Sequence, residues 1–186
     1  ARLDYDSGPF SFTVGGEARF GDVKSKRFIN VAGDRGALTF EADQDARTTS
    51  LYGEMRYRPI ENLSLIVGGI YADGYREQQT VFNSSAGPLD IRGRADFDEF
   101  SPKFGIIYEA TPDIQFYANY SRSAEFPGFI ELAQISSFVP IDAQTAWTAE
   151  IGTRGTVGIA SWDVSLYRSE IDGELLQFTV AQDIPA

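Results

Sequence analysis

Apolar and polar residues alternate in steps of two along most of this chain, as they do in a half-buried β-strand. In residues 145–155, for example, Ala149 and Ile151 fall on one face and Thr148 and Glu150 on the other. The pattern predicts antiparallel strands, each paired with its neighbour in sequence, at residues 10–20, 48–58, 62–73, 97–109, 113–123, 145–155 and 159–170. Helical spacing is weak, and its best short candidate is residues 127–134.

The predicted connections alternate between short and long. Short turns are expected at residues 59–62, 110–113 and 155–158, and long loops at residues 21–49, 73–98 and 123–146. An up-and-down sheet with short turns at one end and long loops at the other is typical of outer-membrane barrels. The predicted fold class is therefore all-β, an antiparallel up-and-down transmembrane β-barrel segment of about eight strands.

A soluble β-sandwich also alternates, so the pattern alone leaves that class open. Three features favour the membrane: loops long on one side only, charges on the polar faces, and aromatic residues near strand ends. Those aromatic residues are Phe10, Phe20, Tyr57, Tyr71, Phe100, Tyr108, Trp147 and Trp162. We therefore expect Phe104, Ile106, Phe116, Ala118, Ile151, Val164 and Leu166 to face lipid. The side chains expected to face the lumen are Glu17, Arg19, Glu54, Arg56, Asn119 and Glu150.

Composition narrows the function classes. The 186 residues carry a formal net charge of −11, which argues against a nucleic-acid partner because phosphate binding needs a clustered basic surface. The chain has no Cys and no His, so it lacks thiolate and imidazole nucleophiles, bases and metal ligands. We expect no catalytic residues, no cofactor and no metal site.

Four segments, in this order, resemble the barrels of TonB-dependent outer-membrane receptors. They are TTSLYGEMRYRPIENLSLIVGGIYADG (48–74), SPKFGIIYEATPDIQFYANYS (101–121), SRSAEFPGFIEL (121–132) and TAWTAEIGTRGTVGIASWDVSLYRSEIDGEL (145–175). No single segment is specific, but the ordered series is. Family barrels have roughly 22 strands around a plugged lumen, so the resemblance implies that residues 1–186 are one part of such a barrel domain. The plug domain and the C-terminal strands are expected to lie outside this sequence.

The resemblance implies a function as well as a fold. It indicates a receptor in the bacterial outer membrane, not an enzyme, that actively takes up a scarce nutrient, most often a ferric siderophore. The expected partners are outer-membrane lipid, the TonB energy-transducing complex acting through the plug, and the ferric siderophore or a similarly bulky nutrient. The alternatives are a passive porin or small structural outer-membrane barrel, and a soluble β-sandwich binding module.

Five residues near the bases of the long loops are candidate ligand contacts. They are Tyr75, Arg76, Arg122, Glu125 and Phe126. An Arg beside a Tyr suits a ferric-siderophore carboxylate or catecholate, through charge and stacking. The other three fall where a strand is expected to leave the membrane, and there they would form a charged and aromatic lip.

Overall fold

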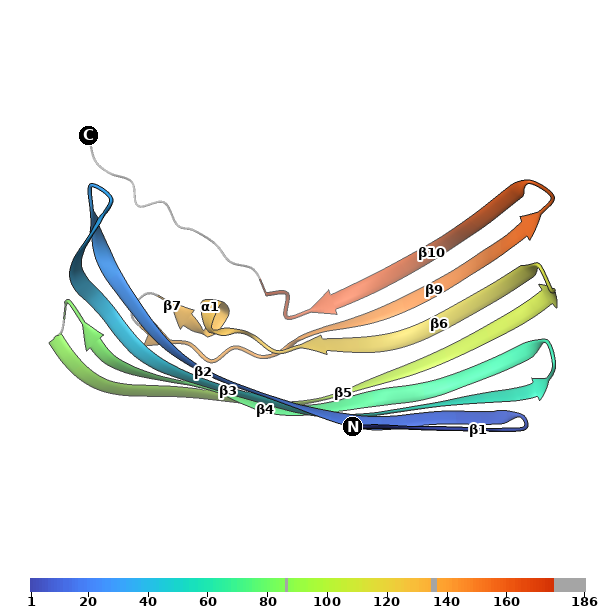
Figure 1. Cartoon of the computed structure of the whole chain (residues 1–186), viewed down its shortest axis with the longest axis horizontal. Coiled ribbons are helices and arrows are strands. Elements are labelled where there is room, and N and C mark those ends of the chain that lie inside the picture. The colour runs from blue at the N-terminus through green and yellow to red at the C-terminus, as the bar shows by residue number, and fades with distance from the viewer. Residues whose placement is uncertain (86, 135–136, 176–186) are drawn as a thin grey trace.

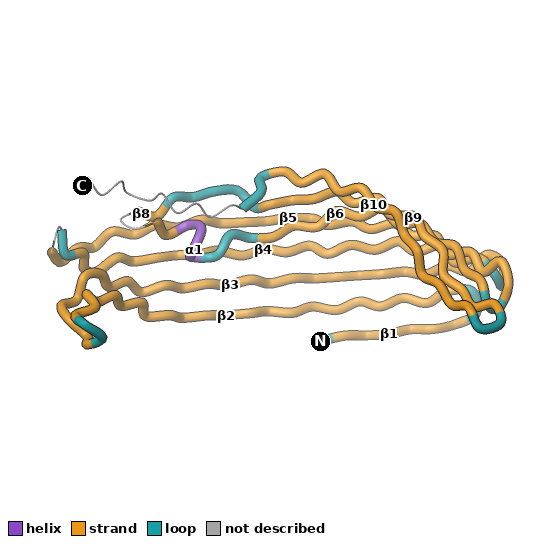
Figure 2. The backbone as a smooth tube through the Cα atoms, turned by 90° about the horizontal axis from the view of Figure 1, so that it is seen from above, coloured by secondary structure: helices purple, strands orange, loops and turns teal. Residues whose placement is uncertain are grey.

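The computed structural model shows one long, curved, antiparallel sheet, and it describes residues 1–85, 87–134 and 137–175. Eight strands lie in the order β1-β2-β3-β4-β5-β6-β9-β10, and a two-stranded piece, β7–β8, lies apart (Figures 1 and 2). The bounds are β1 Arg2–Ser7, β2 Phe10–Val31, β3 Asp34–Ile60, β4 Leu63–Asn83, β5 Gly87–Thr111, β6 Ile114–Glu125, α1 Phe129–Leu132, β7 Ala133–Gln134, β8 Ser137–Phe138, β9 Gln144–Val157 and β10 Ala160–Asp172.

The predicted strands are confirmed, including residues 62–73, which are apolar on both faces. Every strand of the large sheet pairs antiparallel with its neighbour, and the described residues form no second sheet packed face to face on it. The β-sandwich alternative is therefore wrong. β1 was not predicted as a strand, and α1 falls inside the short helical candidate at residues 127–134. Among the described residues, no helix is long and apolar enough to cross a bilayer.

The two ends of the sheet differ as expected. Tight turns at residues 8–9, 61–62, 112–113 and 158–159 lie together at one end, which we call the turn end. At the opposite end, the long loops predicted at residues 21–49 and 73–98 are wrong, because β2 and β3, and likewise β4 and β5, extend through most of these ranges. β2 and β3 continue to a tight turn at Ala32–Gly33, where both residues have positive φ. These extensions could not be predicted from alternation, because consecutive residues such as Asp43, Gln44 and Asp45 are all polar, so both faces of the strand are polar.

Register assigns each side chain to one face, because directly opposed residues in an antiparallel pair point the same way. Phe12, Met55, Val67 and Phe104 form one row across β2–β5. The neighbouring row joins Glu54, Gly68 and Lys103, and an ion pair links Glu54 to Lys103. Polar and apolar rows therefore fall on opposite faces, with the side chains grouped as the alternation predicted.

The polar rows line the concave face of the sheet. Phe97 belongs to this face, because it lies four residues from Ser101 on β5 and side chains on one face of a strand recur every second residue. It packs against Leu132 of α1, and α1 lies inside the trough that the sheet forms (Figure 1). The apolar rows therefore cover the convex face, where large hydrophobic side chains such as Leu166 are mostly exposed.

Aromatic residues bound the apolar part of the convex face at two levels. Toward the turn end these are Phe10, Tyr57, Tyr108 and Trp162, which we call the near aromatic row. Toward the opposite end they are Phe20, Tyr71, Phe100 and Trp147, which we call the far aromatic row; neither set follows a single line of paired residues. Roughly 10 residues per strand at ~3.3 Å and ~40° tilt span about 25 Å, the height of the apolar band of an outer-membrane barrel. Beyond the far aromatic row, the convex face becomes charged, with Asp45, Glu77 and Arg94 side by side. The strands thus carry a bilayer-sized apolar band with a polar extension.

Candidate functional site

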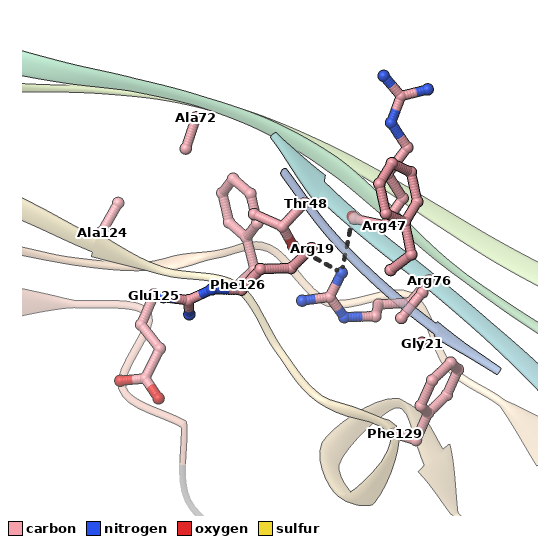
Figure 3. Close-up of a pocket in the computed structure, with 12 residues that line it drawn as sticks. Arg19, Gly21, Arg47, Thr48, Ala72, Arg76, Ala124, Glu125, Phe126 and Phe129 are labelled. Atoms are coloured by element: carbon pink, nitrogen blue, oxygen red, sulfur yellow. Dashed lines mark hydrogen bonds between the residues drawn. The ribbon is translucent and has the colours of Figure 1, made fainter. Parts of the chain in front are cut away.

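A cavity of about 500 Å³ opens on the concave face, just beyond the level of the far aromatic row (Figure 3). Strands β2, β3 and β4, the end of β6 and the chain that follows β6 contribute to it. Its lining residues are Arg19, Phe20, Gly21, Ala46, Arg47, Thr48, Ala72, Arg76, Ala124, Glu125, Phe126 and Phe129.

Strand register explains how residues far apart in sequence meet here. Thr48 of β3 is opposite both Arg19 of β2 and Gly74 of β4, and Ala46 is opposite both Gly21 and Arg76. Most of these positions carry small residues, which leaves space in the cavity wall beside Arg19 and Arg76. A Cβ at Gly74 would lie 2.5 Å from the carbonyl oxygen of Arg47, closer than real Cβ atoms come. A larger residue at that position would force β3 and β4 apart beneath the cavity.

Arg76 is the half-buried cation of the site. Its Nη1 donates to the carbonyl oxygen of Arg47 at 3.0 Å, to Thr48 Oγ1 at 3.2 Å and to the carbonyl oxygen of the preceding residue, Tyr75, at 2.9 Å. All three acceptors are neutral, and Arg76 forms no ion pair with any carboxylate that the structure describes. Burial lowers the pKa of Arg76, because it disfavours the charged form. A partly desolvated cation without a counter-ion favours binding of an anion.

Aromatic and charged groups complete the cavity. Phe126 stacks on Phe97 with ring centroids 5.1 Å apart, and Phe129 lines another part of the cavity, on the other side of Arg76 in the view of Figure 3. Arg19 forms an ion pair with Glu17 on the same strand, so its charge is already partly satisfied. The described residues contain no cluster of three metal-ligating side chains. The arrangement suits capture of an anionic, partly aromatic molecule, and its groups are not placed for acid–base or nucleophilic chemistry.

The structure brings three of the five predicted contacts together: Arg76, Glu125 and Phe126 line the cavity. Glu125 is exposed at its rim. Tyr75 and Arg122 lie elsewhere, so a role for either in ligand binding stays a prediction.

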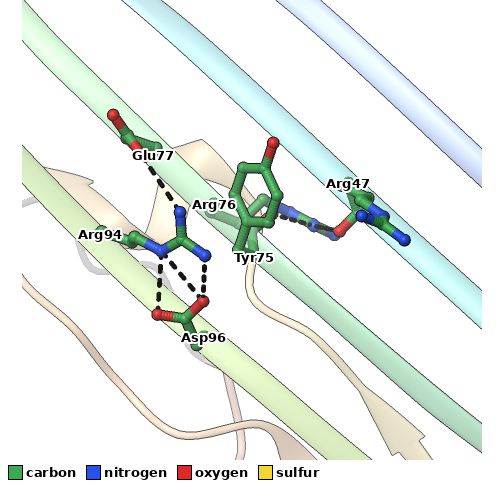
Figure 4. A network of polar contacts seen from close by, with 6 residues as sticks. All are labelled: Arg47, Tyr75, Arg76, Glu77, Arg94 and Asp96. Carbon is green, nitrogen blue, oxygen red and sulfur yellow. Dashed lines mark hydrogen bonds and ion pairs between the residues drawn. The ribbon is translucent and has the colours of Figure 1, made fainter.

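Tyr75 lies on the convex face, opposite to Arg76, because the two are consecutive residues of one strand (Figure 4). The guanidinium of Arg94 sits 4.3 Å from its ring centroid and also pairs with Asp96 and Glu77, at 2.5 and 3.4 Å. Hydrogen bonding to the Asp45 carboxylate raises the pKa of Tyr75, and Arg94 lowers the pKa of Asp96. This convex network binds its own charges together, away from the cavity.

Arg122 bridges β6 to β5 where the two strands part. Their pairing ends at Lys103 and Ser121, and beyond that point the Nη1 of Arg122 donates to Glu99 Oε2 at 2.5 Å and to the carbonyl oxygen of Phe100 at 2.6 Å. Both charged side chains are largely buried, at 21% and 23% exposed. Arg122 thus replaces the missing strand ladder with a charge-assisted contact.

We expect Arg122→Ala to lower the free energy of unfolding by about 1.5–3 kcal/mol, the usual cost of losing a hydrogen bond to a charged group. Urea titration of the complete receptor in detergent measures it. The matched control is Arg92→Ala, on the extension of β5 beyond the apolar band, since the Arg92–Asp90 pair is 64% and 73% exposed. Exposed pairs contribute about 0–1 kcal/mol. Equal effects of the two substitutions would remove the bridging role of Arg122.

Nine of the twelve lining residues were not among the predicted contacts, including Arg19, Thr48 and Phe129. Alternation did place Arg19 on the polar face, which is the only sequence signal for any of these three. Thr48 meets Arg76 through the β3–β4 register, and Phe129 reaches the cavity because the chain after β6 folds into the trough. Neither fact can be derived from local pattern.

Comparison with known proteins gives the same result as the strand pattern. The sequence matches a family described as "TonB dependent receptor-like, beta-barrel" over residues 2–185. Among solved structures, the chain is similar to the unliganded ferric citrate transporter FecA, with a TM-score of 0.72 and 15% identity over 95% of this chain and 27% of that one. It is also similar to the copper transporter OprC, with a TM-score of 0.69 and 12% identity over 91% and 29% of the two chains.

A third similar structure is the closed form of the ferric-catecholate import receptor Fiu from E. coli K12. Its TM-score is 0.68, with 19% identity over 93% of this chain and 30% of that chain. At such identities the likeness concerns the fold alone. The chain spans less than a third of each of these transporters.

Proposed function

We propose that this chain, which belongs to the family of TonB-dependent receptor β-barrels, forms part of the wall of a receptor that takes up a ferric siderophore across the bacterial outer membrane. Members of the family are transporters, not enzymes, and their barrels are outer-membrane proteins. Membership also removes the passive-porin alternative. The proposal covers the cargo, the place of the cavity in its path, and the partners.

The observation that carries the cargo proposal is the environment of Arg76. Its guanidinium is half-buried among neutral acceptors, in the cavity that Phe126 and Phe129 also line. A carboxylate or catecholate oxygen of a ferric chelate would supply the missing negative charge, and a catechol or other flat group would stack on the rings. The similar solved structures include both iron and copper transporters, so the fold by itself does not select the cargo.

The remaining surfaces suit the partners of such a receptor. The convex apolar band, bounded by two aromatic rows, would contact outer-membrane lipid. The concave polar rows would line the path of the cargo and face a plug domain, through which the TonB complex would act. In this arrangement the cavity lies on the medium side of the band, where a descending ligand would meet it first.

We expect Arg76→Ala to weaken binding of an anionic iron chelate to the complete receptor by about 1–3 kcal/mol, the cost of losing a charge-assisted hydrogen bond. Calorimetry with ferric citrate, a ferric catecholate and an uncharged iron chelate of similar size measures it. The loss should be confined to the anionic chelates, because only they meet the charge of Arg76.

The controls are Glu61→Ala and Asp113→Ala, which lie at the turn end, far from the cavity. Neither should change affinity. Arg76→Lys keeps the charge but not the fixed fork of donors, so it should restore part of the loss. Normal affinity of Arg76→Ala for every anionic chelate would remove this cavity from the binding path.

A further inference from the structure

Gly93 occupies an unusual place on the concave face of β5. A Cβ built on it would lie 2.2 Å from Cγ, 2.3 Å from Cβ and 2.5 Å from Cδ1 of Phe138. Real Cβ atoms essentially never approach another atom within 3.0 Å. Because the contact includes Cβ of Phe138, rotation of the ring could not relieve it. Glycine inside a strand weakens the strand and commonly marks a close approach by another part of the protein.

The chain that approaches is the connection from β6 to β9, which we call the inward segment (residues 126–134 and 137–143). It folds back into the trough and does not project from the end of the sheet (Figure 1). Leu132 is 0% exposed and packs with Ala95 and Phe97, which share a face of β5 with Gly93. The partly buried side chains packed against this cluster are Phe126, Phe138, Ile141 and Ala143.

Backbone contacts tie the points of attachment to one another. The Leu132 N–H donates to the carbonyl oxygen of Gly128 at 3.1 Å, and the Val139 N–H donates to the carbonyl oxygen of Leu132 at 2.7 Å. Glu131 accepts a hydrogen bond from the Gly128 N–H at 2.9 Å. The Val139–Leu132 bond ties the neighbour of Phe138 to Leu132, so the two side chains meet β5 together, Phe138 at Gly93 and Leu132 at Ala95 and Phe97.

We propose that the missing side chain of Gly93 leaves the space in which Phe138 packs, a contact that we call the seat. We further propose that the seat holds the inward segment in place as a permanent wall of the cavity. Phe126 and Phe129 belong to the same segment and line the cavity, so the seat sets their position without touching the ligand. Gly93 and Phe138 are thus positioning residues, and the cavity is preformed. The consequence for ligand binding rests on the proposed function, whereas the seating of the segment does not.

A preformed wall differs from a loop that closes when ligand arrives. A closing loop would leave its anchor side chains accessible in the free receptor, and ligand would be needed to bury them. In the seated arrangement side chains of the protein itself bury Leu132, those of Ala95 and Phe97 on β5 together with others of the inward segment. The two arrangements can be separated by measuring the accessibility of residue 132 with no ligand present.

The experiment uses the complete receptor, free of other cysteines, with Leu132→Cys as a reporter. This chain contributes no cysteine of its own. A fluorescent maleimide is the probe, and its labelling rate is followed in outer-membrane preparations without any iron chelate. Ile130→Cys, at a residue 67% exposed, is the reference for an accessible site on the same segment.

We expect Leu132→Cys to label at least tenfold more slowly than Ile130→Cys. Gly93→Ala should raise the rate at residue 132 at least tenfold and leave the rate at residue 130 unchanged. The matched control is Gly105→Ala, on the same face of the same strand, where a Cβ would lie 3.5 Å from its nearest neighbour, Ile66. That substitution should leave both rates unchanged.

Phe138→Ala provides a second variant that puts no clash into β5. It should also raise the rate at residue 132, and adding Gly93→Ala to it should have a smaller effect than Gly93→Ala alone, since Cγ and Cδ1 of Phe138 are gone and only the Cβ at residue 138 remains close to position 93. Equal labelling at residues 132 and 130 in the unsubstituted receptor, or an unchanged rate in both Gly93→Ala and Phe138→Ala, would overturn the proposal. Because no ligand is used, these outcomes are independent of whether Arg76 binds an iron chelate.

Discussion

Residues 1–186, produced alone in detergent, should fail to form a compact, heat-stable barrel. Within the described residues the sheet stays open, because β1 and β10 each have a partner on one side only. The part of β2 beyond the reach of β1 likewise pairs only with β3. Each unpaired backbone N–H or C=O group in an apolar medium costs several kcal/mol, so open edges of this length cannot persist in a membrane.

Gel mobility before and after boiling checks this expectation, with the complete receptor as the control. The complete receptor should run as a compact band that unfolds on heating, whereas residues 1–186 should run at one position in both states. Closure of eight strands would leave an interior just wide enough for side chains. The inward segment already occupies that space, with Leu132 and Phe97 packed together in the trough. A compact band that unfolds only on boiling would show that β1 and β10 can pair.

The strands could be predicted from sequence wherever one face is apolar and the other polar. The same rule failed on the extensions of β2–β5, where water or charged neighbours meet both faces. There Asp22 and Asp45 lie opposite each other, and the proximity of Asp45 raises the pKa of Asp22. β1 escaped prediction because only Leu3 and Tyr5 supply its apolar positions.

The candidate site was only partly accessible to sequence reasoning. Tyr75 and Arg76 were grouped because they are adjacent, and adjacency suits a loop. Once residues 73–83 are seen to be strand, adjacency places the two side chains on opposite faces. The cavity itself depends on which strands pair and on how the inward segment folds back. Gly93 and Phe138 show the limit most clearly, because each is unremarkable in its own sequence neighbourhood.

The assignment of faces has a direct energetic consequence at Leu166. This residue lies on the convex face, opposite Ile151, and is 72% exposed. It stands midway between the two aromatic rows, four residues from Trp162 and four from Glu170, which is opposite Trp147. In the complete receptor folded into lipid vesicles, Leu166→Arg should therefore cost about 2–4 kcal/mol, the penalty for a cation at the bilayer midplane. Guanidinium titration of folding into vesicles measures it.

Ser165→Arg is the matched control, because it puts the same side chain one residue away on the opposite face. Ser165 is directly opposite Gly152, in the concave rows that also hold Glu150 and Arg154. An arginine there would remain in water and near a carboxylate, so the free energy of unfolding should change by less than about 1 kcal/mol. The difference between the two variants isolates the lipid term from any general effect of arginine on strand stability. Equal costs at residues 165 and 166 would show that the convex face does not contact lipid at this level.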